Sequence, residues 1–136
     1  MSHQGMAARV VVGTDLVEIR QVAESIARFG DRYLKRVFTA HELATCGEGA
    51  DRASRLAARF AAKEATLKVL RPVDHGIDWR TIEVHREEGG HCEMILRGAA
   101  CDLARAAKIN SLSVSLSHEA AYAIAVVVGE RVSIEC

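Results

Sequence analysis

Three separate segments of the chain carry side chains that could bind a metal ion and a phosphate group. They are Gly13-Thr14-Asp15-Leu16-Val17-Glu18-Ile19, then Arg59-Phe60-Ala61-Ala62-Lys63-Glu64-Ala65 followed by Lys68, and lastly Ser115-Leu116-Ser117-His118-Glu119. Mg²⁺ keeps several waters in proteins and usually takes one or two carboxylates together with phosphate oxygens of a substrate. Asp15 and Glu64 therefore predict a magnesium site that a phosphate-bearing substrate completes.

Each acid also has an ordinary structural interpretation. An aspartate that follows a short strand and a glycine is most often a turn or cap residue. Glu64 lies beside the apolar stripe of Leu56, Phe60 and Leu67 on a predicted helix, and a buried carboxylate without a partner is costly. An i,i+4 ion pair with Lys68, which contributes about 0.3–0.5 kcal/mol, would be a sufficient partner.

Basic side chains near the two acids could neutralise a bound phosphate. Arg59, Lys63 and Lys68 lie on the same predicted helix as Glu64, although a solvated basic flank is the alternative for each. His118 falls where two strands turn, and we expect it to donate a hydrogen bond to a ligand phosphate. The serines around it do not form the G-x-S-x-G turn of a nucleophilic serine, and they fit a solvated strand face.

A basic stripe at helical spacing predicts a docking surface for an acidic protein. It consists of Arg28, Arg32, Lys35 and Arg36. Aromatic residues make up only 4% of the chain, too few for a surface that stacks nucleic-acid bases. The structural alternative is a solvated helix face.

The pattern along the chain predicts one α+β domain, residues 1–136, with antiparallel strands and a long central helix. We expect strands over 9–12, 81–86, 91–96, 113–117 and 122–128, and helices over 21–36, 51–70 and 98–108. Thr39 is the expected N-cap of a short turn that contains Glu42. Residues 1–6 are expected to be a disordered or added start, with Met6 as a candidate natural first residue.

Composition and charge exclude several classes of protein. The 136 residues are 49% hydrophobic and 26% charged, which argues against disorder, and 18 acidic residues balance 18 basic ones, which argues against a general polyanion binder. No apolar run approaches the roughly 20 residues of a membrane-spanning helix. The four cysteines form no C-x-x-C pair, so we expect free thiols and a cytoplasmic location.

Four motifs together resemble the holo-acyl-carrier-protein synthases, the small type of 4′-phosphopantetheinyl transferase. They are G-T-D-L-V-E-I at 13–19, F-T-x-x-E at 38–42, R-F-A-A-K-E-A at 59–65 with Lys68, and S-L-S-H-E-x-x-Y-A-x-A at 115–125. The resemblance runs from about Val10 to Val128. It implies magnesium-dependent transfer of the phosphopantetheine arm of coenzyme A to a serine of apo-acyl carrier protein, with release of adenosine 3′,5′-bisphosphate.

The resemblance also implies a role for each matching position. Asp15 and Glu64 match the metal-binding carboxylates and, with Lys68, the catalytic group. Lys68, Arg59 and His118 match positions that face the phosphates or the nucleotide of coenzyme A, while Arg32 and Arg36 match basic residues on the carrier-docking side. Arg28, from the same basic stripe, is expected to bind the partner together with them. A homotrimer with sites between subunits is expected on the same ground.

Two questions stay open at this level. The general base is Glu64, Asp15 or a water on the metal, and the sequence does not choose among them. The segment Leu70 to Gly76 departs from the Gly-Thr-Gly-like loop of the family, which affects the expected coenzyme contacts. The competing functions are a non-catalytic module that binds coenzyme A or a nucleotide, and a module that only docks a carrier protein.

Overall fold

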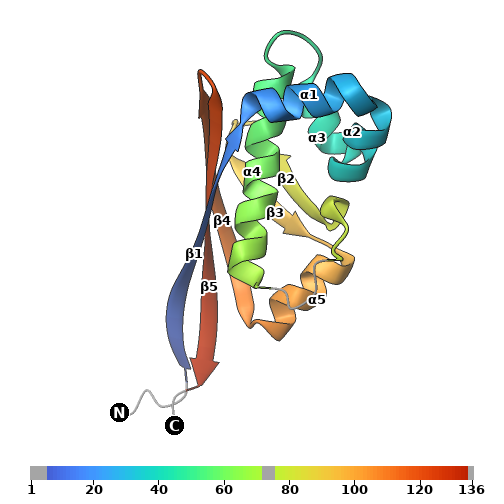
Figure 1. The fold of residues 1–136 in the computed structure, drawn as a ribbon. Helices are drawn as coiled ribbons and strands as arrows, with labels where there is room; N and C mark the ends of the chain where they lie inside the picture. Colours follow the sequence, from blue (N-terminus) through green and yellow to red (C-terminus); the bar gives the residue numbers. More distant parts are fainter. Residues whose placement is uncertain (1–5, 72–75, 135–136) are drawn as a thin grey trace.

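A long three-stranded antiparallel sheet forms one side of the molecule in the computed structural model, which describes residues 6–71 and 76–134 (Figure 1). Its strand order is β1 (Met6–Glu18), β5 (Tyr122–Ile134) and β4 (Ile109–Glu119). The central strand β5 follows β4 through a tight turn, and it pairs with β1 along its whole length. The expectation for residues 1–5 lies outside the described part, and Met6 begins β1.

The first strand is longer than the sequence indicated. We expected it to end at Gly13, so that Asp15 would follow the strand, and this was wrong, since β1 continues to Glu18. The backbone of every residue from Met6 to Glu18 faces a partner on β5, including Asp15 opposite Ala125. Pairing with β5 therefore keeps Asp15 inside a strand, where the backbone fixes the direction of its side chain.

The long helix α4 (Arg52–Leu70) lies between this sheet and the rest of the molecule (Figure 1). It approaches β1 so closely at Gly13 that a Cβ atom built there would lie 2.1 Å from the carbonyl oxygen of Ala65. Glycine is therefore required at position 13 by close packing and not by a turn. This contact fixes the position of α4 along β1.

Three short helices cover the N-terminal end of α4. The single helix expected over 21–36 is instead two helices, α1 (Ile19–Phe29) and α2 (Asp31–Val37). They are separated by Gly30, whose φ of 57° breaks the helical conformation. The expected N-cap is confirmed: Thr39 and Glu42 form a reciprocal capping box at the start of α3 (Ala40–Cys46).

A hairpin and a last helix complete the fold on the other side of α4. The hairpin joins β2 (Ile82–Arg86) to β3 (Cys92–Leu96), as expected, after a 3₁₀ turn η1 (Trp79–Thr81). Helix α5 (Gly98–Ala106) then leads into β4. The α+β class with antiparallel strands and a long helix is confirmed.

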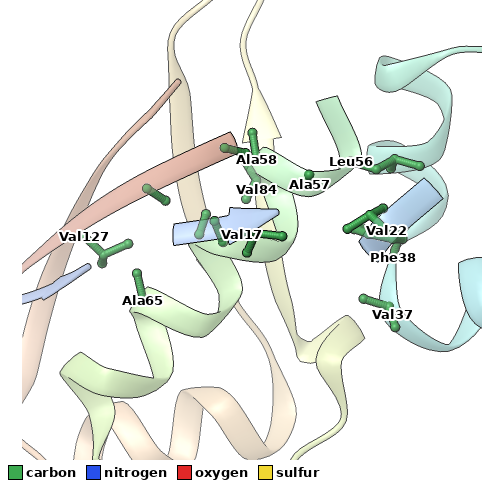
Figure 2. Close-up of a cluster of buried hydrophobic side chains, with 14 of the residues drawn as sticks. Val17, Val22, Val37, Phe38, Leu56, Ala57, Ala58, Ala65, Val84 and Val127 are labelled. Atoms are coloured by element: carbon green, nitrogen blue, oxygen red, sulfur yellow. The ribbon is translucent and has the colours of Figure 1, made fainter. Parts of the chain in front are cut away.

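The core lies around α4 and consists largely of small side chains. Figure 2 shows Ala57, Ala58 and Ala65 of α4 among branched side chains from the sheet, including Val17 and Val127. Small residues let the helix backbone lie close to both strands. Of the apolar stripe expected on α4, Leu56 is fully buried, whereas Phe60 and Leu67 are half-buried and lie outside the core proper. Within the described residues, none of the helices is long and apolar enough to span a membrane.

Candidate active site

The N-terminal and central segments meet at an ion pair between β1 and α4. The ammonium of Lys68 lies 3.2 Å from Oδ1 of Asp15 and donates a hydrogen bond of 2.7 Å to the carbonyl oxygen of Thr14. About a fifth of the Asp15 side chain is exposed and about half of the Lys68 side chain. The site is therefore open to solvent on one side and fixed by the sheet on the other.

Glu64 lies one helical turn before Lys68, and its environment disfavours a negative charge. Burial raises the pKa of this carboxyl group, the negative charge of Asp15 raises it further, and the positive charge of Lys68 partly opposes both. Lys68 makes its ion pair with Asp15 and not with Glu64, so the i,i+4 pair considered from the sequence is not the arrangement in the structure. Two acids thus lie close enough to repel each other.

This pair of acids fits a divalent cation with few protein ligands. In the described part of the chain, no group of three or more histidine, cysteine, aspartate or glutamate residues gathers as a metal site. A cation held here would draw on Asp15 and Glu64 and would need oxygen ligands from water or a substrate. Mg²⁺ has this preference, and its positive charge would offset the burial and the repulsion by Asp15 that raise the pKa of Glu64.

Lys63 does not face this site, so the suggestion that it neutralises a substrate phosphate was wrong. Its ammonium is fully buried, lies 2.8 Å from Oε1 of Glu42, and donates to the carbonyl oxygens of Trp79 and Ile82. Burial lowers the pKa of Lys63, which the Glu42 carboxylate partly opposes. The second oxygen of Glu42 accepts from the backbone N–H of Val84. This network joins α3, α4 and β2.

Arg59 also lies away from the two acids within one chain. It is nine residues before Lys68, about two and a half helical turns, which places it on the opposite face of α4. The residue is 5% exposed, and its Nη1 donates to the carbonyl oxygen of Arg55. Burial raises the pKa of the Cys46 thiol, and the positive charge of Arg59 partly opposes that shift, so the two side chains are near each other.

His118 is exposed near the end of β4, close to the turn at Ala120. It was expected in the turn itself, but it still pairs with Ala123 of β5, whose other partner is Val17 of β1. Residues that face each other across strands share one side of a sheet. His118 therefore lies on the same side of the sheet as Asp15, two strands away from it.

The structure shows an apolar groove beside the basic residues that the sequence analysis did not find. Its cavity is about 550 Å³ and is lined by Phe29, Arg32, Tyr33, Arg36, Val37, Phe60 and Trp79. The rings of Phe60 and Trp79 lie 5.3 Å apart. The basic stripe is split by Gly30, with Arg28 on α1 and the other three residues on α2. The half-exposed Phe29, at the end of an amphipathic helix, was the available signal for the groove.

Comparison with known proteins agrees with the motifs. The sequence profile of the 4′-phosphopantetheinyl transferase superfamily matches residues 11–127. The chain is 41% identical over 119 residues to the holo-[acyl-carrier-protein] synthase of Koribacter versatilis, and the aligned part covers 87% of this chain and 95% of the relative. It belongs to this superfamily, among the holo-[acyl-carrier-protein] synthases. The corresponding protein of Dehalococcoides mccartyi is 44% identical over 118 residues, 87% of this chain and 96% of the relative.

Solved structures of synthases have the same fold as this family member. The Chronobacterium ammoniagenes synthase in complex with coenzyme A superposes with a TM-score of 0.79 at 29% identity, over 94% of this chain and 99% of that one. The Helicobacter pylori synthase in complex with coenzyme A gives 0.74 at 31% identity, over 90% and 100%.

The segment Leu70 to Gly76, which we expected to depart from the loop of the family, is described only in part. Helix α4 ends on Arg71, which has a left-handed conformation with φ of 50° where glycine is usual. The rest of the departure, residues 72–75, lies outside the described residues.

Proposed function

We propose that this holo-acyl-carrier-protein synthase holds one Mg²⁺ between Asp15 and Glu64. With that ion it transfers the 4′-phosphopantetheine group of coenzyme A to a serine of apo-acyl carrier protein and releases adenosine 3′,5′-bisphosphate. The observation that carries the proposal is the convergence of Asp15, Glu64 and Lys68 from segments about 50 residues apart in the sequence. A chain that only bound the coenzyme would not need two acids held close enough to repel.

The proposed roles follow from the charges at the site. A bound Mg²⁺ would neutralise charge on the pyrophosphate of coenzyme A during phosphoryl transfer. Lys68 is fixed by Thr14 and Asp15, so its ammonium is held where a phosphate oxygen could accept a hydrogen bond. Asp15 in turn is held by the pairing of β1 with β5.

Glu64, Asp15 and a water on the metal are the three candidates for the general base that takes the proton of the attacking serine. Burial and Asp15 raise the pKa of Glu64 in the protein without Mg²⁺, and a bound ion would lower it again, so this shift does not select Glu64.

Arg59 and His118 are proposed to contact the coenzyme from a neighbouring subunit of a homotrimer. Within one chain they lie on the opposite face of α4 and two strands away, so one chain alone does not bring them to Asp15. The outer face of the sheet, on the side away from α4, is a candidate surface for contact between subunits. It exposes large apolar side chains of β1 and β5, namely Val10 (67%), Val12 (59%), Leu16 (61%), Tyr122 (50%) and Ile124 (42%). A mass measurement in solution tests the trimer, and Val12→Glu should dissociate it.

The carrier protein is proposed to dock on α1, α2 and the groove beside them. Arg32 and Arg36 line the groove together with Phe29 and Trp79, so positive charge borders an apolar surface. That combination suits an acidic helix with apolar side chains. Arg28 lies 5.3 Å over the ring of Phe29 and extends the charge onto α1.

We also propose that the protein works in the cytoplasm, where carrier proteins and coenzyme A would be available to it. The described cysteines Cys46, Cys92 and Cys101 are free, which is consistent with a reducing compartment.

Mass spectrometry of apo-acyl carrier protein is the direct test. The carrier is incubated with the enzyme, coenzyme A and Mg²⁺, and we expect it to gain the mass of one phosphopantetheine group. Omission of Mg²⁺, with a chelator present, should prevent the gain. An unchanged carrier, under conditions where coenzyme A binds, would instead support the non-catalytic module.

A further inference from the structure

A second cavity, of about 220 Å³, lies at the C-terminal end of α4, beyond the two acids. Its floor is apolar and its rim is basic: Val11, Val69 and Ile109 form part of the floor, and Arg71, Lys108 and Arg131 line the rim. Drug-sized ligands occupy cavities of roughly 300–1,000 Å³. This one is therefore sized for a small group and is too small for a nucleoside.

A fourth positive charge lies on β1 next to one of the rim residues, although it does not line the cavity. Arg9 lies directly opposite Arg131 in the β1–β5 ladder, and both are exposed. They share the inner side of the sheet with Val11, two residues along β1. Like charges directly opposite each other destabilise a strand pair, so this arrangement has a cost that a bound anion would remove.

The negative groups in the described part of the chain do not balance these charges. There, none of Arg9, Arg71, Lys108 and Arg131 has an acid within ion-pair distance. Glu130 points to the outer side of the sheet, because it precedes Arg131 on β5. The carboxyl ends of α4 and α5 lie here, and each supplies roughly half a negative charge. The four basic side chains minus the partial charges of these two helix ends leave a net charge of about +3 around the cavity.

Two of the rim residues occupy strained backbone positions. Arg71 has φ of 50° and Lys108 has φ of 62°, a region that favours glycine. Each such residue costs on the order of 1 kcal/mol or more. Long basic side chains thus stand at two positions where glycine would fit without strain.

We propose that this cavity binds a phosphate-class oxyanion, held by Arg71, Lys108 and Arg131 with Arg9 beside them. Guanidinium groups bind phosphate through paired hydrogen bonds, and the apolar floor strengthens the attraction by lowering the local dielectric constant. Arg71 is seven residues beyond Glu64, about 10 Å along α4, so the anion is separate from the proposed metal. The anion is either inorganic phosphate or the 3′-phosphate of coenzyme A.

Calorimetric titration with inorganic phosphate at a fixed chloride concentration of about 0.15 M tests the site. We expect saturable binding to the wild type, weakened at least tenfold in Arg71→Gln/Arg131→Gln. Arg105→Gln is the matched control, because Arg105 is an exposed arginine of α5 that pairs with Asp102 and does not line the cavity. The double variant should also have a higher Tm in phosphate-free buffer, since the opposed charges are reduced. Absence of saturable binding, or equal affinity in wild type and double variant, overturns the proposal.

A second titration, with coenzyme A, distinguishes inorganic phosphate from the 3′-phosphate of coenzyme A. Only this second titration rests on the proposed transferase function. If the 3′-phosphate occupies the cavity, phosphate competes with coenzyme A, and the double variant loses affinity for coenzyme A but not for dephospho-coenzyme A. If free phosphate is the ligand, phosphate and coenzyme A bind together and the variant keeps its coenzyme affinity. The mass-spectrometric transfer assay in phosphate-free buffer tests the function independently of this site.

Discussion

Lys68 and Asp15 are 53 residues apart in the sequence, and in the fold their charged groups lie 3.2 Å apart. The contact exists because Gly13 lets α4 lie against β1, two residues before Asp15. It brings Glu64, one turn away on α4, within range of the Asp15 charge. The ion pair therefore marks the point where the two proposed metal ligands come together.

Removal of either acid should abolish transfer while the fold survives. Asp15→Asn and Glu64→Gln each leave one carboxylate, and the loss of several kcal/mol of charge stabilisation corresponds to a fall in kcat of about 100-fold or more. Carrier modification followed over time at several Mg²⁺ concentrations measures this. A variant that reached near wild-type rates at ordinary Mg²⁺ would show that its acid is not a metal ligand.

The pH dependence of stability should report on Glu64. The pKa of Glu64 is raised from its ordinary value of 4.5, so between the two pKa values the folded protein binds more protons than the unfolded chain. Stability then falls as pH rises through that window. With Mg²⁺ absent from both samples, the Tm of the wild type should fall relative to that of Glu64→Gln as the pH rises above about 4.5. Equal Tm differences between wild type and variant at all pH values would contradict the raised pKa.

Mg²⁺ should reverse the loss of stability that rising pH causes through Glu64, because the metal binds the charged carboxylate. We expect Mg²⁺ to raise the Tm of the wild type at neutral pH and to lose that effect as the pH falls through the pKa of Glu64. Glu64→Gln should show little response to Mg²⁺ at any pH, and this part of the test does not require activity.

Lys63→Met should destabilise the protein without a specific loss of coenzyme binding. The substitution leaves the Glu42 carboxylate buried without its ammonium partner, which costs about 3–5 kcal/mol. Tm should fall by on the order of 10 °C or more. Addition of Glu42→Gln should recover part of that loss, because the uncompensated charge is gone. Weaker coenzyme affinity at an unchanged Tm would instead indicate that Lys63 contacts substrate.

Gly13→Ala should affect both stability and activity, because the new Cβ would meet a backbone carbonyl oxygen that cannot move alone. Overpacking of this kind costs about 1–3 kcal/mol. It should also move Glu64 and Lys68 away from Asp15 and lower kcat. The control is Gly89→Ala in the β2–β3 turn, where the nearest atom would lie 3.9 Å away. Unchanged Tm and kcat in Gly13→Ala would mean that the close approach is not required.

Charge reversal of Arg32 and Arg36 should weaken carrier docking and leave coenzyme binding nearly intact. Rim charges act mainly on the association rate, and salt screens them over roughly 8–10 Å at ordinary ionic strength. In Arg32→Glu/Arg36→Glu we expect a higher KM for the carrier and a flatter dependence of kcat/KM on salt.

Arg105→Glu is the control for this prediction. Arg105 is an exposed arginine of α5 that pairs with Asp102, and it lies outside both the stripe and the groove, so its reversal should leave the carrier KM unchanged. Equal salt slopes in the wild type and the double variant, with the carrier KM unchanged, would mean that the stripe is a solvated face.

The sequence by itself determined the family, the class of fold and the residues proposed to act. Local signals were sufficient for the Thr39 cap, the β2–β3 hairpin and the length of α4, because capping, turns and helix propensity depend on neighbours in the chain. The four motifs identified Asp15, Glu64 and Lys68 as candidates, because these residues match positions in the motifs of the family.

Only the tertiary structure decided which charges are used in the site and which hold the fold together. Lys63 and Lys68 look alike on the helix, yet the first is buried against Glu42 and the second reaches Asp15. The direction of each depends on what packs around α4, and that packing joins residues far apart in the sequence. The same holds for β1, which continues past Gly13 because β5 supplies hydrogen-bond partners from the other end of the chain.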